Sequence, residues 1–447
     1  MMKYKNDKIY KLFLIQIIML FFMPAMGKAP LAPEPGLVMA VYKGIMYVIY
    51  GGISVWIVLL FLKQKKTINK KYIWWVVSFF ALCIVAGIWG LIRGVPITDI
   101  IRGFLPFVWY IYIIVIVETL TSKLDKVLLL LAGISVLYAL RTFVYYIIYC
   151  FGKSDVRVSF YFPKANGFMF ILGVILLIYL FITRNSQNKI FYIGMIICFI
   201  AVLLVEAKAS LIAALAGALL FVVLAVISML IKRKSSADRE IRKSILIKSI
   251  IGIITLLTVT IIIFSGTSLS KRWKNAVAIS RVDTNKGKTG SKGKAEGKDK
   301  IQVKIVDEGS VGVRIIEYKT AYSLWKQSPI LGQGLGYRWS APGLDYGGPV
   351  IYMHNIIAYT LIDFGLIGII FLGSIFVSLI IMLIKVLRIK NVYTAEKMKF
   401  FLYISGIGSA FIYANLTAIF RDLEFVILFA VLISGAICEY SRLKEEV

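Results

Sequence analysis

The sequence predicts an all-α integral membrane protein with about twelve transmembrane helices, and three observations support this fold class. Hydrophobic residues make up 60% of the 447 residues and charged residues 17%, whereas ordinary soluble domains carry roughly 25% charged residues. The apolar residues gather in runs of about 17 to 25, the helix length that crosses a bilayer core. Lysine and arginine are unevenly divided between the two sets of loops that join these runs, as the positive-inside rule describes.

Twelve apolar runs define the predicted spans in chain order. They are Ile9–Met26, Gly44–Leu62, Ile73–Ile92, Ile100–Val117, Val127–Ile147, Asn166–Ile182, Ile190–Val205, Ser210–Ile231, Ile245–Phe264, Asn355–Ile384, Phe400–Leu416 and Leu423–Tyr440.

Two parts of this series allow a second interpretation. The first span follows basic residues and precedes small ones, as a signal peptide would. We prefer a retained helix because the next loop, "KAPLAPEPG", has no convincing small-x-small cleavage site at the right place. Residues 190–231 are about twice as long as one span, and only "EAKAS" at 206–210 interrupts them. We therefore predict a tight turn there.

The distribution of basic residues predicts which side of the membrane each loop occupies. With a cytoplasmic N-terminus, 27 of the 52 lysines and arginines fall in inner segments and 9 in short outer segments. Another 15 fall in the long loop, which translocates largely regardless of its charge. We expect both termini in the cytoplasm and three regions: helices one to nine at 1–264, an extracytoplasmic loop at 265–353, and the last three helices with the C-terminus at 354–447.

Composition also excludes several classes of protein. The formal net charge is +29, but in a bilayer protein this excess reflects topology and contact with anionic lipid, so we expect no nucleic-acid partner. The four cysteines stand in or beside apolar stretches without a CxxC pair or a nearby histidine. We therefore expect no disulfide framework, no metal site and no cofactor.

The long loop is the one extended excursion from the membrane, and function is expected to concentrate there. Its basic, low-complexity part at 283–300 is typical of a disordered tether. A predicted amphipathic helix at the membrane boundary follows and ends at Pro329. Its two predicted faces are Val313, Ile316, Thr320 and Leu324 on one side, and Arg314, Tyr318, Ala321 and Trp325 on the other.

The segment "GQGLG" after this helix allows two interpretations. It can stop the helix and turn the chain, or it can let the backbone approach a ligand closely at Gly332 and Gly334. No strand precedes it, so a dinucleotide site is not indicated.

His354 is the only histidine of the chain and stands where the loop re-enters the membrane. An imidazole titrates near neutral pH and can accept a proton from a hydroxyl group. The alternative is a histidine satisfied by structural contacts alone. Asn355 either caps the next helix or orients the imidazole ring.

Basic residues on the predicted outer side form the second group of candidates. They are Arg157, Lys208 and Arg314, with Arg102 and Arg141 as weaker candidates. Ionisable groups at membrane depth are functional candidates because burying them is costly. The alternative for each is a snorkelling side chain or an ion pair, and Glu317 stands at the i+3 spacing that would pair it with Arg314.

One imidazole and several fixed cations fit the transfer of a sugar from a lipid diphosphate. The acceptor hydroxyl would lose its proton to the base and attack the anomeric carbon. Arginine and lysine would stabilise the leaving diphosphate in place of a divalent metal. No nucleotide sugar exists outside the cell, so the donor would be lipid-linked, and a single displacement would invert the anomeric centre.

These residues resemble the O-antigen ligase and polymerase superfamily of bacterial surface-polysaccharide enzymes. The resemblance lies mainly in 313–368: an arginine, a helix with Trp325, "SPILGQGLG", a short loop, "HN" and "DFGLIG". Earlier, Arg157 and Asn166 in "VRVSFYFPKANGFMF" match a family arginine and a helix start. Lys208 stands where the family usually has the arginine of a Ser-Arg pair, and Asp363 where glutamate is commoner.

The resemblance implies a metal-independent, inverting membrane glycosyltransferase. His354 would activate the acceptor, and Arg314 and Lys208 would hold the diphosphate of an undecaprenyl-linked glycan. Ligases of this superfamily transfer finished polymer to a lipid, protein or other acceptor, whereas polymerases join lipid-linked repeat units. We favour the polymerase, because the usual Ser-Arg pair is missing and the rest of the chain is tyrosine-rich. A chain-length regulator is a further candidate partner.

Two other classes of function also fit some of these features. A transporter for a lipid-linked sugar would suit twelve spans with both ends inside, but the two halves of the sequence show no internal symmetry. A structural protein of an envelope assembly complex would predict that replacing His354 has no effect.

Overall fold

The computed structural model describes residues 2–22, 37–64, 70–150, 164–184, 188–205, 208–231, 236–266, 310–341, 348–389 and 394–445. These residues are almost entirely helical, which confirms the all-α prediction. The longer helices are α1 (Met2–Phe22), α2 (Leu37–Leu62), α3 (Lys70–Ile92), α6 (Leu124–Tyr145), α7 (Lys164–Thr183), α8 (Asn188–Leu204), α9 (Lys208–Ile231), α10 (Ser236–Gly266), α12 (Ser310–Gln327), α13 (Ile356–Arg388), α14 (Thr394–Leu416) and α15 (Leu423–Glu445).

Each predicted span overlaps a helix, but not every helix is equally typical of a membrane span. Within the described residues, eight segments are long and apolar enough to cross a bilayer: α2, α3, residues 97–119, α6, α9, α10, α13 and α15. Helices α7 and α8 are apolar but shorter. Helices α1 and α14 fall in neither group, so the total of twelve stays a prediction. Of the turn predicted at 206–210, residues 208–210 are instead the first residues of α9, and residues 206 and 207 lie outside the described ranges.

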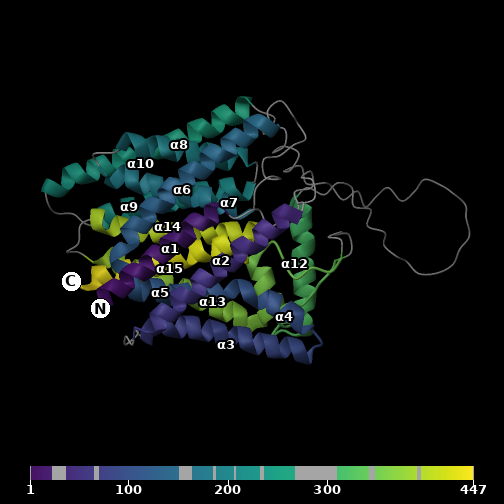
Figure 1. Ribbon diagram of the computed structural model, residues 1–447. Coiled ribbons are helices and arrows are strands. Elements are labelled where there is room, and N and C mark those ends of the chain that lie inside the picture. The colour runs from purple at the N-terminus through teal and green to yellow at the C-terminus, as the bar shows by residue number, and fades with distance from the viewer. Residues whose placement is uncertain are drawn as a thin grey trace, which may run out of the picture.

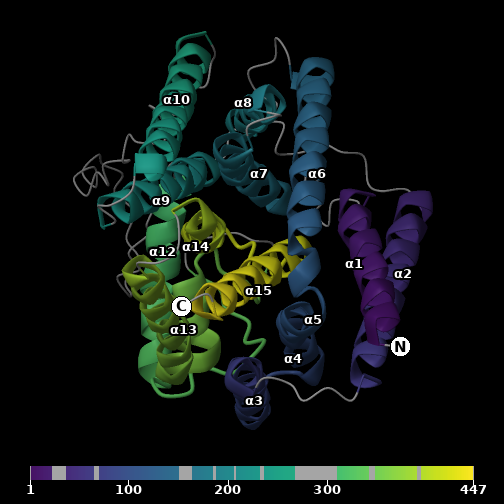
Figure 2. The same ribbon diagram turned by 90° about the vertical axis from the view of Figure 1, so that its left-hand side faces the viewer.

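Most helices run side by side, whereas α12 lies across one end of the bundle (Figure 1). Both ends of the chain lie at the opposite end of the bundle (Figure 1), on different sides of it (Figure 2). In the turned view, α15 occupies the middle of the bundle (Figure 2), and 17 of its 23 residues are buried. This arrangement agrees with a boundary helix opposite the termini. The assignment of either end to a side of the membrane stays a prediction.

Helix α12 differs from the predicted helix in the composition of its faces. Its most buried side chains are Glu317 and Ala321, each 1% exposed and one turn apart. Ala321 was predicted to share a face with Tyr318, yet Tyr318 is 47% exposed. The reason is that α12 packs against α13, and the packed side of α12 carries Glu317 and Ala321.

The fourth predicted span is not one regular helix. It consists of α4 (Ile97–Phe104), a 3₁₀ segment (Leu105–Ile111) and α5 (Tyr112–Thr119). Pro106 explains the interruption, because its ring excludes an ordinary α-helical hydrogen bond at that point. Helix α4 is thereby a separate short element at the same end of the bundle as α12 (Figure 1).

Helix α13 is also interrupted, at Gly365, where a continuous span was predicted. The backbone there has φ 61° and ψ −151°, a conformation that glycine adopts at little cost. The N–H groups of Leu366 and Ile367 donate to the carbonyls of Pro329 and Ile330, at 2.9 and 3.3 Å. The loop after α12 therefore enters the hydrogen-bond ladder of α13.

Candidate functional site

A histidine–carboxylate pair lies at the α12 end of the bundle. His354 Nδ1 is 2.7 Å from Glu317 Oε1, and the His354 backbone N–H donates to Glu317 Oε2 at 3.3 Å. Glu317 is 1% and His354 9% exposed. A carboxylate so deeply buried requires partners of this kind, because an unpaired buried charge is strongly destabilising. From the sequence, Glu317 was predicted only as a partner of Arg314. The structure adds its contact with His354.

Arg314 contacts the same carboxylate. Its Nη1 is 3.5 Å from Glu317 Oε2, and the side chain of Arg314 is 24% exposed. The two residues stand one turn apart on α12, which confirms the predicted i, i+3 pair. Glu317 thus connects Arg314 to His354, and the two predicted catalytic residues share one buried anion.

Asn355 caps helix α13, which is one of the two roles predicted for it. Its Oδ1 accepts a hydrogen bond from the Ala358 N–H at 2.8 Å. Its Nδ2 donates to the backbone oxygen of Asn415 at 2.9 Å and to the Tyr318 hydroxyl. These contacts join α13 to α12 and to the end of α14. A direct contact between Asn355 and substrate stays a prediction.

The residues just before His354 pair with the segment that follows the glycine-rich loop. Trp339 and Val350 exchange two backbone hydrogen bonds of 2.9 Å, and the Trp339 indole N–H donates to the Tyr352 carbonyl at 3.0 Å. The Tyr352 ring meets the His354 imidazole edge to face, with 5.6 Å between centroids. Burial, and to a smaller extent the charge of Glu317, raise the pKa of the Tyr352 hydroxyl, so this neighbour stays protonated.

The glycine-rich loop packs against other helices rather than standing apart from them. Gly332 and Gly334 have φ values of 68° and 99°, which side chains of other residues rarely adopt. A Cβ atom on Gly332 would lie 2.2 Å from the Ile362 carbonyl oxygen, and one on Gly334 would lie 2.4 Å from the Gly90 Cα. The structure therefore gives both glycines a packing role, and a role in substrate contact stays a prediction.

Lys208 begins α9, and a chain of contacts connects this point to Asn355. The Ser210 hydroxyl of α9 donates to the Tyr413 hydroxyl of α14 at 3.3 Å. Two residues later, Asn415 contacts Asn355. The beginnings of α9 and α13 therefore meet around one end of α14, which brings this predicted cation to the same end of the bundle as His354.

The other predicted cations have different positions. Arg102, on α4, is 64% exposed on its side chain and lies 3.7 Å from Asp99. Arg157 and the basic tether at 283–300 lie outside the described residues. Within the described ranges, no cluster of three or more His, Cys, Asp or Glu side chains forms a candidate metal site.

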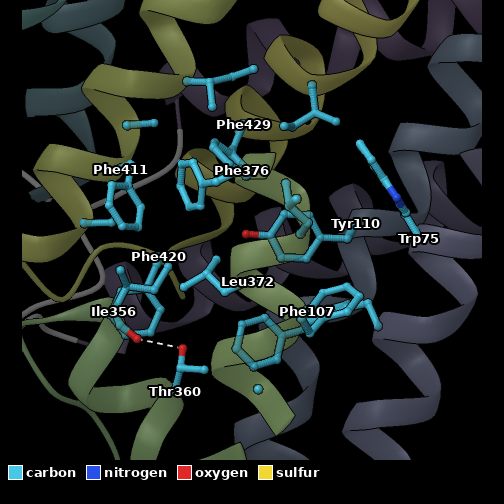
Figure 3. A pocket seen from close by; sticks show the side chains of 18 of the residues that line it. Trp75, Phe107, Tyr110, Ile356, Thr360, Leu372, Phe376, Phe411, Phe420 and Phe429 are labelled. Carbon is cyan, nitrogen blue, oxygen red and sulfur yellow. Dashed lines mark hydrogen bonds between the residues drawn. The ribbon is translucent and has the colours of Figure 1, made fainter. Parts of the chain in front are cut away.

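An apolar cavity of about 140 Å³ lies among α3, the 97–119 segment, α13, α14 and α15. Aromatic side chains from several helices point toward it (Figure 3), including Phe107, Tyr110, Phe376, Phe411, Phe420 and Phe429. The lining Thr360 hydroxyl donates to the Ile356 carbonyl of its own helix at 2.7 Å. The lining reaches Ile356, the residue after Asn355, so the cavity begins close to His354.

A comparison with protein families shows which part of the chain resembles a known family. A family model described as O-antigen ligase matches residues 172–373. The match confirms the predicted resemblance to the O-antigen ligase and polymerase superfamily over these residues. The match and the apolar helices support a membrane glycosyltransferase of the O-antigen ligase and polymerase type. A search of curated proteins finds no match.

The O-antigen ligase match covers a little under half of the chain, from within α7 to within α13. It includes Lys208, Arg314, Glu317 and His354. It does not include α4 or the segment between α14 and α15. The Glu317–His354 pair could not be predicted from the sequence beyond the presence of one acidic residue on the predicted boundary helix, because 37 positions separate the two residues.

Proposed function

We propose that this protein transfers a glycan from an undecaprenyl-diphosphate-linked donor to an acceptor hydroxyl on the outer face of the bacterial cytoplasmic membrane. The contact between His354 Nδ1 and the buried Glu317 carboxylate carries this proposal. An ionised carboxylate at Nδ1 holds the ring proton there and leaves the lone pair on Nε2. An imidazole in this state is suited to accept a proton from a hydroxyl group.

The reaction is a single displacement. The acceptor oxygen forms a bond to the anomeric carbon while its proton passes to His354 Nε2. The bond between the anomeric carbon and the diphosphate oxygen breaks, and its electron pair leaves with the polyprenyl diphosphate. Glu317 stabilises the imidazolium that results, as a buried carboxylate does in other histidine-dependent enzymes. The anomeric configuration is inverted.

The leaving diphosphate gains charge as the bond breaks. Arg314 stands one turn from Glu317 at the partly exposed edge of the site, and a guanidinium offers two parallel donors to phosphate oxygens. Lys208, at the beginning of α9, adds a second cation at the same end of the bundle. We assign stabilisation of the leaving group to these side chains rather than to a metal ion.

The apolar cavity supports a lipid-linked donor. Its lining includes α13 residues from Ile356 to Leu379, on both sides of the interruption at Gly365. The lining is almost wholly carbon, and a volume of about 140 Å³ suits a segment of a hydrocarbon chain. The glycan diphosphate would then lie at the His354 end.

Filling this cavity is expected to weaken binding of long-chain donors. Ile375→Trp replaces an aliphatic side chain of the cavity lining with a larger indole ring. We expect the donor KM to rise about tenfold, which corresponds to about 1.4 kcal/mol of binding free energy. Donors with a short polyprenyl chain should be affected less. Ile380→Trp is the matched control, since Ile380 lies on the same helix, is 54% exposed and does not line the cavity. Equal effects of both variants on donors of both lengths would contradict this placement.

We favour polymerisation of repeat units over ligation of finished polymer as the reaction. The test uses purified protein in nanodiscs with lipid-linked glycan extracted from a strain that lacks the protein. We expect longer glycans, release of polyprenyl diphosphate and an inverted anomeric configuration in the new bond, and we expect activity to persist in EDTA. Retention of configuration, or no transfer to any supplied glycan or lipid acceptor, would contradict the proposal.

A further inference from the structure

The segment that carries His354 has two arms, Arg338–Ala341 and Gly348–His354, joined by the Trp339–Val350 backbone hydrogen bonds. We call these two arms the His354 hairpin. Glu317 belongs to α12 instead. The 2.7 Å contact between Glu317 and His354 therefore depends on how the hairpin is fixed relative to the helices.

The first arm is fixed to α4 by an arginine fork. Arg338 Nε and Nη2 donate to Asp99 Oδ2 and Oδ1 at 2.7 and 2.8 Å. Asp99 is 2% exposed, whereas the Arg338 side chain is 46% exposed. Two parallel charge-assisted hydrogen bonds restrict orientation as well as distance. Removing one partner would leave the buried carboxylate poorly compensated.

The second arm is fixed to the same helix by Arg421, which stands between α14 and α15. Its Nη1 donates to the Ile351 carbonyl at 2.9 Å, three residues before His354. Its Nη2 donates to the Arg102 carbonyl of α4 at 2.8 Å. One guanidinium thus connects the hairpin to the C-terminal part of α4.

Both anchors meet on α4, at Asp99 and at Arg102, and each holds a different arm. We infer that Asp99 and Arg421 are positioning residues, which fix the His354 hairpin on α4 and so hold the imidazole against Glu317. Both lie outside the 172–373 family match. The consequence for catalysis rests on the proposed function, whereas the effect on the position of His354 does not.

A small displacement of His354 would matter for the proposed reaction. A general base must lie within hydrogen-bond reach of the proton that it removes, and an error of about 1 Å can reduce a rate about 10²-fold. Loss of an anchor is therefore expected to lower kcat. The donor KM should change less than kcat, because Asp99 does not line the apolar cavity and Arg421 meets its lining only at the Tyr359 ring, 5.8 Å from the guanidinium carbon.

The test measures the accessibility of His354 directly. Since the chain has one histidine, carbethoxylation by diethyl pyrocarbonate, followed at 240 nm and by peptide mass spectrometry, reports that residue alone in a protein without a histidine tag. We expect Asp99→Asn to raise the carbethoxylation rate about tenfold, and Arg421→Gln to do the same. A tenfold change in the carbethoxylation rate corresponds to a free-energy difference of about 1.4 kcal/mol.

Glu439→Gln is the matched control. Glu439 is 5% exposed and pairs with Lys399 and Arg442, both at 2.9 Å, so the variant removes a comparable buried carboxylate away from α4 and the hairpin. Its carbethoxylation rate should equal that of the wild type. If Asp99→Asn does not fold, Arg338→Lys, which keeps the charge but not the fork, takes its place with a smaller expected increase.

Two outcomes would overturn the inference. One is a wild-type carbethoxylation rate in both the Asp99 (or Arg338) and the Arg421 variants. The other is an equal increase in Glu439→Gln, which would indicate a general loss of stability. Failure of the proposed function is a separate result: transfer would be absent from the wild type itself, while the carbethoxylation rates would still report the anchors.

Discussion

The His354→Ala variant is expected to lose glycan transfer in the purified assay, with kcat reduced about 10²- to 10⁴-fold, the range for removal of a general base. The acceptor hydroxyl would then have to lose its proton to water. The donor KM should change little, because Arg314, Lys208 and the cavity remain. The measurement is the initial rate of polyprenyl diphosphate release at saturating donor.

His354→Gln makes this prediction sharper. A glutamine amide can replace the imidazole as a partner of Glu317 but cannot act as a base, so the same loss of kcat is expected in a protein of nearly wild-type stability. Melting temperatures in detergent provide the control. A kcat within about threefold of the wild type in both variants would exclude His354 as the base, since such a change is far below the effect of general-base catalysis.

Glu317→Gln is expected to have the second-largest effect, a fall in kcat of about 10²-fold or more, by analogy with buried carboxylates that orient a catalytic histidine. The amide N–H can donate a hydrogen bond to Nδ1, which favours the tautomer that carries its proton on Nε2. It also cannot stabilise the imidazolium. The loss of the Arg314 ion pair should raise the donor KM as well, because Arg314 is then held less firmly.

Glu439→Gln again separates chemistry from stability. It makes the same acid-to-amide change at a buried, ion-paired site remote from His354, and we expect kcat within about twofold of the wild type, as for changes away from functional features. If both variants lose activity and melting temperature in parallel, the role of Glu317 is structural. Loss of kcat in Glu317→Gln alone supports the dyad.

Much of the helical architecture could be predicted from the sequence, because in a bilayer the length of an apolar run and its flanking charges determine where a helix can lie. The predicted pair at Arg314 and Glu317 was also confirmed, since residues three apart on a helix are neighbours. His354 was singled out because it is unique and stands at the end of a loop.

The remaining features depend on contacts between residues that are distant in the chain. Asp99 and Arg338 are 239 positions apart, and no local pattern indicates that α4 meets the loop after α12. The interruption of α13 at Gly365 was missed for the same reason. A glycine within an apolar run is compatible with a regular membrane helix. The break is compensated by backbone hydrogen bonds with the loop after α12, to the Pro329 and Ile330 carbonyls and from the Gln333 N–H.

The most direct test of the central claim is the glycan carried by the polyprenyl lipid in a deletion strain that expresses either the wild-type protein or His354→Ala at equal levels. We predict that wild-type protein restores polymeric surface glycan and that His354→Ala leaves single repeat units on the lipid carrier. Accumulation of long polymer on the carrier would assign the same chemistry to a ligase. Surface glycan restored equally by His354→Ala would contradict the claim that His354 is the catalytic base.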